Sequence, residues 1–149
     1  PKTRKSLKRK VRIMQTDLFN KRIFIIEDNM PNQTITQMLL TTSGAIVAYD
    51  RWGIDAIRRM QEFAPIDLVI LDLMFPDNIT GYDVFDQIRK QPEFQDIPIV
   101  AVSASDPSEA IPRTQTRGFS GFIRKPVDFI KFPKQIKQIL SGEPVWERR

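Results

Sequence analysis

The 149-residue chain contains neither cysteine nor histidine. The absence of cysteine excludes disulfides, thiol nucleophiles and sulfur-ligated metals. The absence of histidine excludes imidazole acid–base catalysis, the commonest ligand of transition metals, and any role of this chain as a histidine phosphodonor. Oxygen-rich sites, which suit hard cations such as Mg²⁺, remain possible. A functional site in this chain is therefore expected to be built from carboxylates.

The sequence also lacks a twenty-residue apolar run, so no segment is expected to span a membrane. No signal-peptide pattern opens the chain, and a cytoplasmic location is the expectation. With 41% hydrophobic and 28% charged residues, the composition is that of a globular protein, and the length fits one domain with a substantial core.

The net charge of +5 is concentrated at the N-terminus. Seven basic residues lie within the first twelve positions, so the rest of the chain carries 16 basic against 18 acidic groups. Residues 1–18 show little apolar periodicity and are expected to form a disordered tail, which is either simply solvated or a nonspecific contact for an anionic partner. The predicted domain covers residues 19–142, and residues 143–149 form a short C-terminal tail.

Five short apolar segments that barely alternate predict buried parallel strands, and helical patterns separate them. This order predicts an α/β fold with a five-stranded parallel sheet, in the flavodoxin-like, doubly wound (βα)5 arrangement with strand order 2-1-3-4-5. The segments are residues 23–27, 45–49, 67–72, 97–103 and 119–124.

One helix carries a conflicting signal. Asp106 and Pro107 are typical of a helix start, with Asp106 as the cap and Pro107 at the first position. Pro112 follows soon after, lacks the donor for the Ser108 carbonyl and crowds it. The sequence therefore predicts that Pro112 interrupts this helix almost at once.

Three acidic residues follow two of the predicted strands: Glu27 and Asp28 end the first, and Asp72 ends the third. Open α/β sheets bind ligands at the carboxyl ends of their strands, and these two strands are neighbours in the predicted order. Three carboxylates in one crevice stay ionised only if a cation joins them, and Mg²⁺ is the natural candidate. The alternative is that the acids merely end strands where the chain returns to water.

A carboxylate beside Mg²⁺ can attack phosphorus and form an acyl phosphate. Such a transfer needs a fixed cation and a hydroxyl or amide donor near the phosphoryl oxygens. Ser103 closes the fourth predicted strand, and Lys125, followed by Pro126, closes the fifth. The alternatives are a strand-end hydroxyl bonded to backbone and a lysine that faces solvent.

Over about residues 21–141 the chain resembles the receiver domain of two-component response regulators. Each matching motif is weak alone, but five in order at strand ends are highly specific. They are Ile26-Glu27-Asp28-Asn29, Asp72-Leu73-Met74-Phe75-Pro76, Gly81, Val102-Ser103-Ala104 and Phe122-Ile123-Arg124-Lys125-Pro126.

The resemblance implies a role for each acidic residue. Asp72 corresponds to the phosphoacceptor, and Glu27 and Asp28 would hold Mg²⁺ beside it. The backbone carbonyl of Met74 would complete the protein ligands.

The resemblance also implies a switch. Ser103 would be the hydroxyl that moves to the phosphoryl group, Lys125 its ion-pair partner, and Phe122 the aromatic whose rotamer follows Ser103. The Lys125–Pro126 bond would be cis. Phe122 is equally well explained as a core aromatic residue, because an apolar strand residue needs no function.

Two positions depart from the family pattern. Gly81 lies one residue further from Asp72 than usual, which indicates an insertion in the loop over the site. Met74 places an apolar side chain two residues past the acceptor, where polar groups in the family can assist water attack. We therefore expect the phosphoryl group to be hydrolysed slowly.

The resulting prediction is a stand-alone response regulator, phosphorylated by a histidine kinase or a histidine phosphotransfer protein. Its output would be a protein contact through the face of the fourth helix, fifth strand and last helix, with no enzymatic turnover beyond slow self-dephosphorylation. The alternatives are an unphosphorylated interaction module and an aspartate-nucleophile phosphatase, although Asp72 lacks a second aspartate two positions on. A nucleotide binder and a nucleic-acid binder acting through the tail are weaker alternatives. Trp146 either anchors a partner or folds back on the domain.

Overall fold

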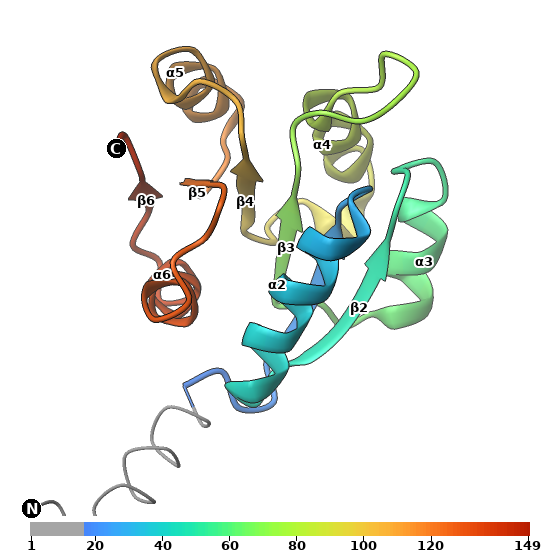
Figure 1. Cartoon of the computed structure of the whole chain (residues 1–149). Helices are drawn as coiled ribbons and strands as arrows, with labels where there is room; N and C mark the ends of the chain where they lie inside the picture. Colours follow the sequence, from blue (N-terminus) through green and yellow to red (C-terminus); the bar gives the residue numbers. More distant parts are fainter. Residues whose placement is uncertain (1–16) are drawn as a thin grey trace, which may run out of the picture.

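A parallel sheet of six strands lies at the centre of the computed structural model, which describes residues 17–149 (Figure 1). The strand order is β2-β1-β3-β4-β5-β6, so the predicted order 2-1-3-4-5 is confirmed and a short sixth strand is added at the β5 edge. The strands are β1 (Arg22–Ile26), β2 (Ile46–Asp50), β3 (Leu68–Leu71), β4 (Ile99–Ser103), β5 (Gly121–Arg124) and β6 (Val145–Trp146).

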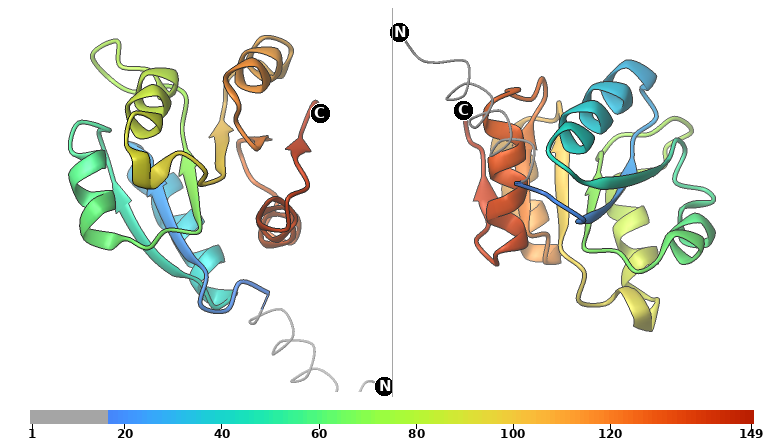
Figure 2. Two further views of the ribbon diagram at one scale, coloured as in Figure 1. Left: turned by 180° about the vertical axis from the view of Figure 1, so that it is seen from behind. Right: turned by 90° about the horizontal axis from the view of Figure 1, so that it is seen from below.

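Helices cover both faces of the sheet, as Figure 2 shows from two further directions. Buried residues of α2 and α6 share one apolar cluster, and those of α3, α4 and α5 share the other. The helices are α2 (Met30–Thr42), α3 (Ala56–Phe63), α4 (Gly81–Arg89), α5 (Pro107–Arg117) and α6 (Lys131–Leu140), with a short 3₁₀ turn η1 (Pro92–Phe94) before β4.

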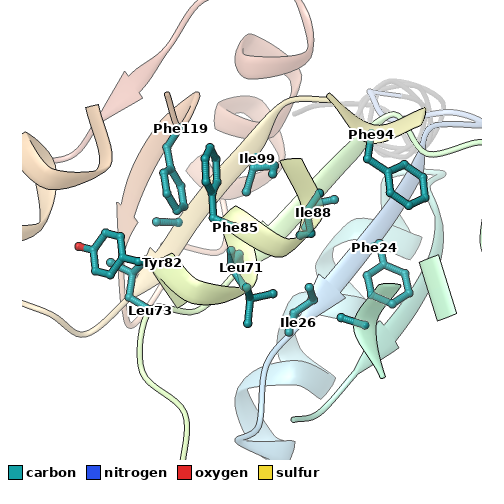
Figure 3. Close-up of a cluster of buried hydrophobic side chains, with 14 of the residues drawn as sticks. Phe24, Ile26, Leu71, Leu73, Tyr82, Phe85, Ile88, Phe94, Ile99 and Phe119 are labelled. Carbon is teal, nitrogen blue, oxygen red and sulfur yellow. The ribbon is translucent and has the colours of Figure 1, made fainter. Parts of the chain in front are cut away.

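The unalternating strand sequences follow from this double cover. In β1, Ile23 and Ile25 enter the cluster under α2 and α6, whereas Phe24 and Ile26 enter the cluster on the opposite face, part of which is drawn in Figure 3. All four side chains are buried. Because successive side chains of a strand point to opposite faces, only a strand covered on both sides is apolar at every position.

The N-terminal boundary differs from the expectation. Residues 1–16, most of the predicted tail, lie outside the described residues. Leu18, which the sequence places in the tail, is fully buried, and its N–H donates to the carbonyl of Ser43 at 2.9 Å. The packed domain therefore begins before β1.

Within residues 17–149, no helix has the length and apolar character that a membrane span requires.

The prediction that Pro112 interrupts its helix is wrong, because α5 is an uninterrupted helix of 11 residues with Pro112 inside it. The helix is defined at both ends: the Asp106 side chain caps its start, and Gly118 ends it in a left-handed conformation with φ of 96°. Pro112 is exposed, whereas its neighbour Ile111 is buried in the apolar cluster on this face of the sheet. Packing of this face outweighs the one backbone hydrogen bond that proline removes.

We expect Pro112→Ala to raise the free energy of unfolding by about 1–2 kcal/mol, because alanine restores the missing donor and removes the crowding of the Ser108 carbonyl. Little packing is lost, since Pro112 is exposed. Urea denaturation of both proteins measures the change. The matched control is Pro107→Ala, where proline occupies the first helical turn and suits the helix, so no gain in stability is expected. An unchanged or lower stability of Pro112→Ala would contradict this account.

Candidate functional site

The structure brings the three acidic residues together at the carboxyl ends of β1 and β3. Ile26 of β1 is paired with Leu71 of β3, so the residues that follow these strands are neighbours. One carboxylate oxygen from each of Glu27, Asp28 and Asp72 lies within 4.8 Å of the other two. Glu27 and Asp72 are buried and Asp28 is half-buried. The topology therefore creates the carboxylate cluster, as parallel pairing of these strands requires.

Lys125 lies between two of these carboxylates. Its Nζ is 3.0 Å from Oδ2 of Asp72 and also donates to Oε2 of Glu27. Its side chain is only 14% exposed, so it does not face solvent. The bond between Lys125 and Pro126 is cis. One lysine offsets part of the negative charge of the acids, and its position is set by the end of β5.

The backbone holds the other oxygen of Asp72. Oδ1 accepts a hydrogen bond from the N–H of Leu73 at 2.7 Å and a longer one from the N–H of Met74 at 3.4 Å. The N–H of Asp72 itself donates to the carbonyl of Ile26 at 3.1 Å. The carboxylate is thus oriented by the chain immediately after it and by β1.

Glu27 carries the strongest electrostatic perturbation of the site. Burial, followed by the nearby charge of Asp72, raises the pKa of Glu27 to about 7. The ammonium of Lys125 and the N–H of Asn29, which donates at 3.1 Å, act in the opposite direction but do not offset the burial. Near neutral pH the cluster is therefore short of positive charge, which favours a cation at this position.

Ser103 is buried at the end of β4 and does not contact the acids directly. Its hydroxyl is hydrogen-bonded to the Ser105 hydroxyl at 2.9 Å and accepts from the Ser105 N–H at 3.2 Å. The N–H of Lys125 donates to the Ser103 carbonyl at 3.0 Å, which ties the ends of β4 and β5 together. Phe122 is fully buried in the apolar cluster of α3, α4 and α5.

The three acids, Lys125 and Ser103 line one open pocket of about 470 Å³, whereas Phe122 does not reach it. Sequence reasoning missed several of its members. Asn29 had a signal, because an asparagine two residues before proline is typical of a helix start, and its side chain does cap α2. No sequence signal pointed to Ser105, because its contact with Ser103 depends on the turn after β4. The lining residues are Glu27, Asp28, Asn29, Asn32, Asp72, Met74, Ser103, Ala104, Ser105 and Lys125.

The loop after Asp72 forms a tight turn beside the pocket. Met74 and Thr80 form an antiparallel bridge, and the N–H of Phe75 donates to the Ile79 carbonyl at 3.1 Å. Asp77 and Asn78 both have φ of 61°, a left-handed conformation in which these residue types are enriched. The Met74 side chain lines the pocket and is 64% exposed. Because it is apolar, it adds no strong hydrogen-bonding group there.

The donor set fits a hard divalent cation. Three carboxylates offer oxygen atoms to a common point, and the pocket is open enough to admit water and a further oxygen ligand. Mg²⁺ in proteins uses a few carboxylates and keeps several waters. Glu27, Asp28 and Asp72 are therefore the residues that would hold it.

We expect the affinity for Mg²⁺ to rise about tenfold per pH unit up to about pH 7 and to level off above it, because the metal must displace a proton from Glu27. Titration calorimetry between pH 5.5 and 8.5 measures the affinity, and Glu27→Gln should flatten its dependence on pH. A pH-independent affinity would contradict the assignment.

The free energy of unfolding of the metal-free protein should change in the opposite direction. The pKa of Glu27 is 4.5 in the unfolded chain and about 7 in the folded chain, so the stability falls as the pH rises across that window.

Comparison with known proteins gives a consistent result. The family model of the response regulator receiver domain matches residues 23–137. The polar-differentiation response regulator DivK of Brucella ovis is 29% identical over 121 residues, which are 81% of this chain and 97% of DivK. The CAI-1 autoinducer sensor kinase/phosphatase CqsS of Vibrio cholerae is 32% identical over 124 residues, 83% of this chain, which spans only 18% of that relative.

Solved structures agree on the fold. The chemotaxis protein CheY4 of Vibrio cholerae superposes with a TM-score of 0.74 at 20% identity, covering 80% of this chain and 98% of CheY4. The receiver domain of a signal transduction histidine kinase from Syntrophus aciditrophicus has a TM-score of 0.69 at 28% identity, covering 82% of this chain and 91% of that one.

Proposed function

The chain belongs to the response regulator receiver domain family, and from this premise we propose that Asp72 accepts a phosphoryl group from the phosphohistidine of a histidine kinase or a histidine phosphotransfer protein. One observation carries the proposal: the Asp72 carboxylate is buried, oriented by two backbone N–H groups and paired with Lys125. A carboxylate oxygen attacks phosphorus, the bond from phosphorus to the donor imidazole breaks, and an acyl phosphate forms on Asp72.

Glu27, Asp28, Asp72 and the backbone carbonyl of Met74 are the proposed ligands of Mg²⁺. When bound, the ion would neutralise the acids and draw in phosphoryl oxygens. Lys125 adds a second positive charge on the β5 side. Because its ammonium already lies 3.0 Å from Asp72, a phosphoryl group on this carboxylate would come within reach of the lysine.

The proposed response begins at Ser103. Its hydroxyl, now bonded to Ser105, would turn toward a phosphoryl oxygen, and the space it leaves would be taken by Phe122. The conformational equilibrium of the face around α5, β5 and α6 would then shift, and with it the protein partners that this face can bind.

Other functions of the same pocket receive less support. Met74 occupies the position two residues past Asp72 with an exposed apolar side chain, so it offers no acid for phosphatase turnover. The same side chain cannot orient an attacking water, and this supports slow loss of the phosphoryl group. The histidine donor would itself be phosphorylated from ATP inside the cell. The proposed location of this protein is therefore the cytoplasm.

Intact-protein mass spectrometry of the wild-type protein tests the proposal. Incubation with acetyl phosphate and Mg²⁺ is expected to give one phosphate adduct, and chelation of Mg²⁺ with EDTA should prevent it. A receiver domain known to be phosphorylated serves as the control for the reagent. Failure of this chain alone to form an adduct would favour an unphosphorylated interaction module, whereas sustained release of phosphate would favour a phosphatase.

A further inference from the structure

The C-terminal segment pairs with the edge of β5 that faces away from β4. Val145 and Trp146 form β6, parallel to β5, with Gly121 paired to Val145 and Phe122 paired to Trp146. The N–H of Glu147 donates to the Phe122 carbonyl at 2.9 Å. Figures 1 and 2 show this short strand beside β5 at the end of the sheet opposite β2. The edge is thus closed by the chain itself.

The edge is shaped for a close backbone approach. A Cβ atom placed on Gly121 would lie 2.7 Å from the Val145 carbonyl oxygen and 3.1 Å from Ile139 Cδ1. The first distance is shorter than real Cβ contacts allow, and a backbone carbonyl cannot swing away as a flexible side chain can. Glycine at this position therefore lets another strand dock against β5.

An aromatic side chain anchors the docked segment. Trp146 is half-buried and packs against the apolar cluster that contains Phe122, its partner in the ladder. Paired residues of neighbouring strands point to the same face of a sheet, so the indole extends this cluster past the last full strand. A large rigid aromatic gains much contact area at low conformational cost, as anchors of binding interfaces do.

An acidic side chain completes the contact. One carboxylate oxygen of Glu147 accepts from the N–H of Arg124 at 3.0 Å, and the other accepts from Nε2 of Gln135 at 2.6 Å. The edge thus contacts three successive residues, which are apolar, aromatic and acidic. Hydrogen bonds to an ionised carboxylate are the stronger kind, so the third position contributes to selectivity.

The segment that provides these groups is short and only half-buried. β6 has two residues, and edge segments with few buried contacts open locally at a lower free energy than the whole domain needs to unfold. We propose that the β5 edge is a strand-docking site, closed in this state by Val145–Glu147, and that an extended partner segment with the same apolar–aromatic–acidic triplet binds there when the latch opens. The latch is residues 145–147, and its opening does not require phosphorylation of Asp72.

Hydrogen exchange in the 149-residue chain tests whether the latch opens. The amide of Glu147 is expected to be protected but to exchange faster than the buried amides of β1 and β3, because it is freed by local opening. Exchange of Glu147 at the same rate as β1 and β3 would mean that the latch opens only when the domain unfolds, and would overturn the proposal.

Peptide binding tests whether the opened edge accepts a strand. A fluorescein-labelled peptide with the sequence of residues 142–149 is titrated with wild-type protein and with Trp146→Ala. The wild-type edge is free only for the fraction of time that the latch is open, which weakens the apparent affinity by that fraction. We expect Trp146→Ala to bind the peptide at least tenfold more tightly than wild type. The same peptide with alanine in place of tryptophan should bind neither protein.

Two further substitutions probe the β5 edge and the latch separately. Gly121→Ala in the Trp146→Ala background is expected to remove peptide binding, since its Cβ occupies the space of the docked backbone. Unchanged protection of the β1 and β3 amides shows that each variant is folded. If Trp146→Ala is not folded, Glu147→Ala, which loses only the two side-chain hydrogen bonds, replaces it with the same expected gain. A folded, unlatched variant that binds the peptide no better than wild type would refute the proposal.

Discussion

Asp72→Asn is expected to abolish the phosphate adduct that the wild-type protein forms with acetyl phosphate and Mg²⁺. The amide lacks the anionic oxygen that attacks phosphorus, so the rate of adduct formation should fall by more than about 100-fold. The substitution also removes one negative charge from the proposed metal site, which weakens Mg²⁺ binding. Intact-protein mass spectrometry over a time course measures both the yield and the rate of adduct formation.

The fold should survive this substitution. The amide oxygen of asparagine can still accept the hydrogen bonds of Leu73 and Met74, and Lys125 keeps its contact with Glu27. Asp77→Asn is the matched control, because it makes the same chemical change on an exposed residue of the loop after β3, and it should be phosphorylated like wild type. An undiminished adduct on Asp72→Asn would place the phosphoryl group elsewhere and refute the assignment.

Gly81→Ala is expected to lower the free energy of unfolding by about 3 kcal/mol or more, through overpacking against rigid backbone. A Cβ atom on Gly81 would lie 2.1 Å from the carbonyl oxygen of Asp72 and 2.7 Å from the Cα of Leu73. The N–H of Gly81 also donates to the Leu73 carbonyl at 2.9 Å, which holds the start of α4 against this loop. The clash is relieved only if α4 or the chain at Asp72 moves.

Because the clash involves the backbone of the proposed phosphoacceptor, the folded fraction of Gly81→Ala should also form the phosphate adduct more slowly. Urea denaturation and the mass-spectrometric time course measure the two effects. Gly142→Ala is the control: a Cβ atom there meets nothing within 4 Å, but φ is 97°, so it should cost only about 1–2 kcal/mol of left-handed strain. Equal losses in the two variants would show that the close approach at Gly81 is unimportant.

The sequence by itself determined the sheet and the composition of the pocket. Apolar runs such as Ile23–Ile26 have no polar side chain to place in water, so both of their faces must be covered, and parallel strands between helices follow. Parallel strands end at one edge, and this brought Glu27, Asp28 and Asp72 together from positions far apart in the chain. The order of the strands was predictable because few right-handed, unknotted connections exist for five such units.

Tertiary structure decided the features that depend on competition between local and distant contacts. Pro112 disfavours a helix locally, but the buried face of α5 outweighs that cost. Val145 and Trp146 are too short a segment to signal a strand, and they pair only because Gly121 leaves room at the β5 edge. The contacts of Lys125 with Glu27 and of Ser103 with Ser105 likewise depend on where the ends of β4 and β5 lie in space. Periodicity and residue type report on local preference and on which faces are buried, whereas these contacts join groups whose distance only the packed chain defines.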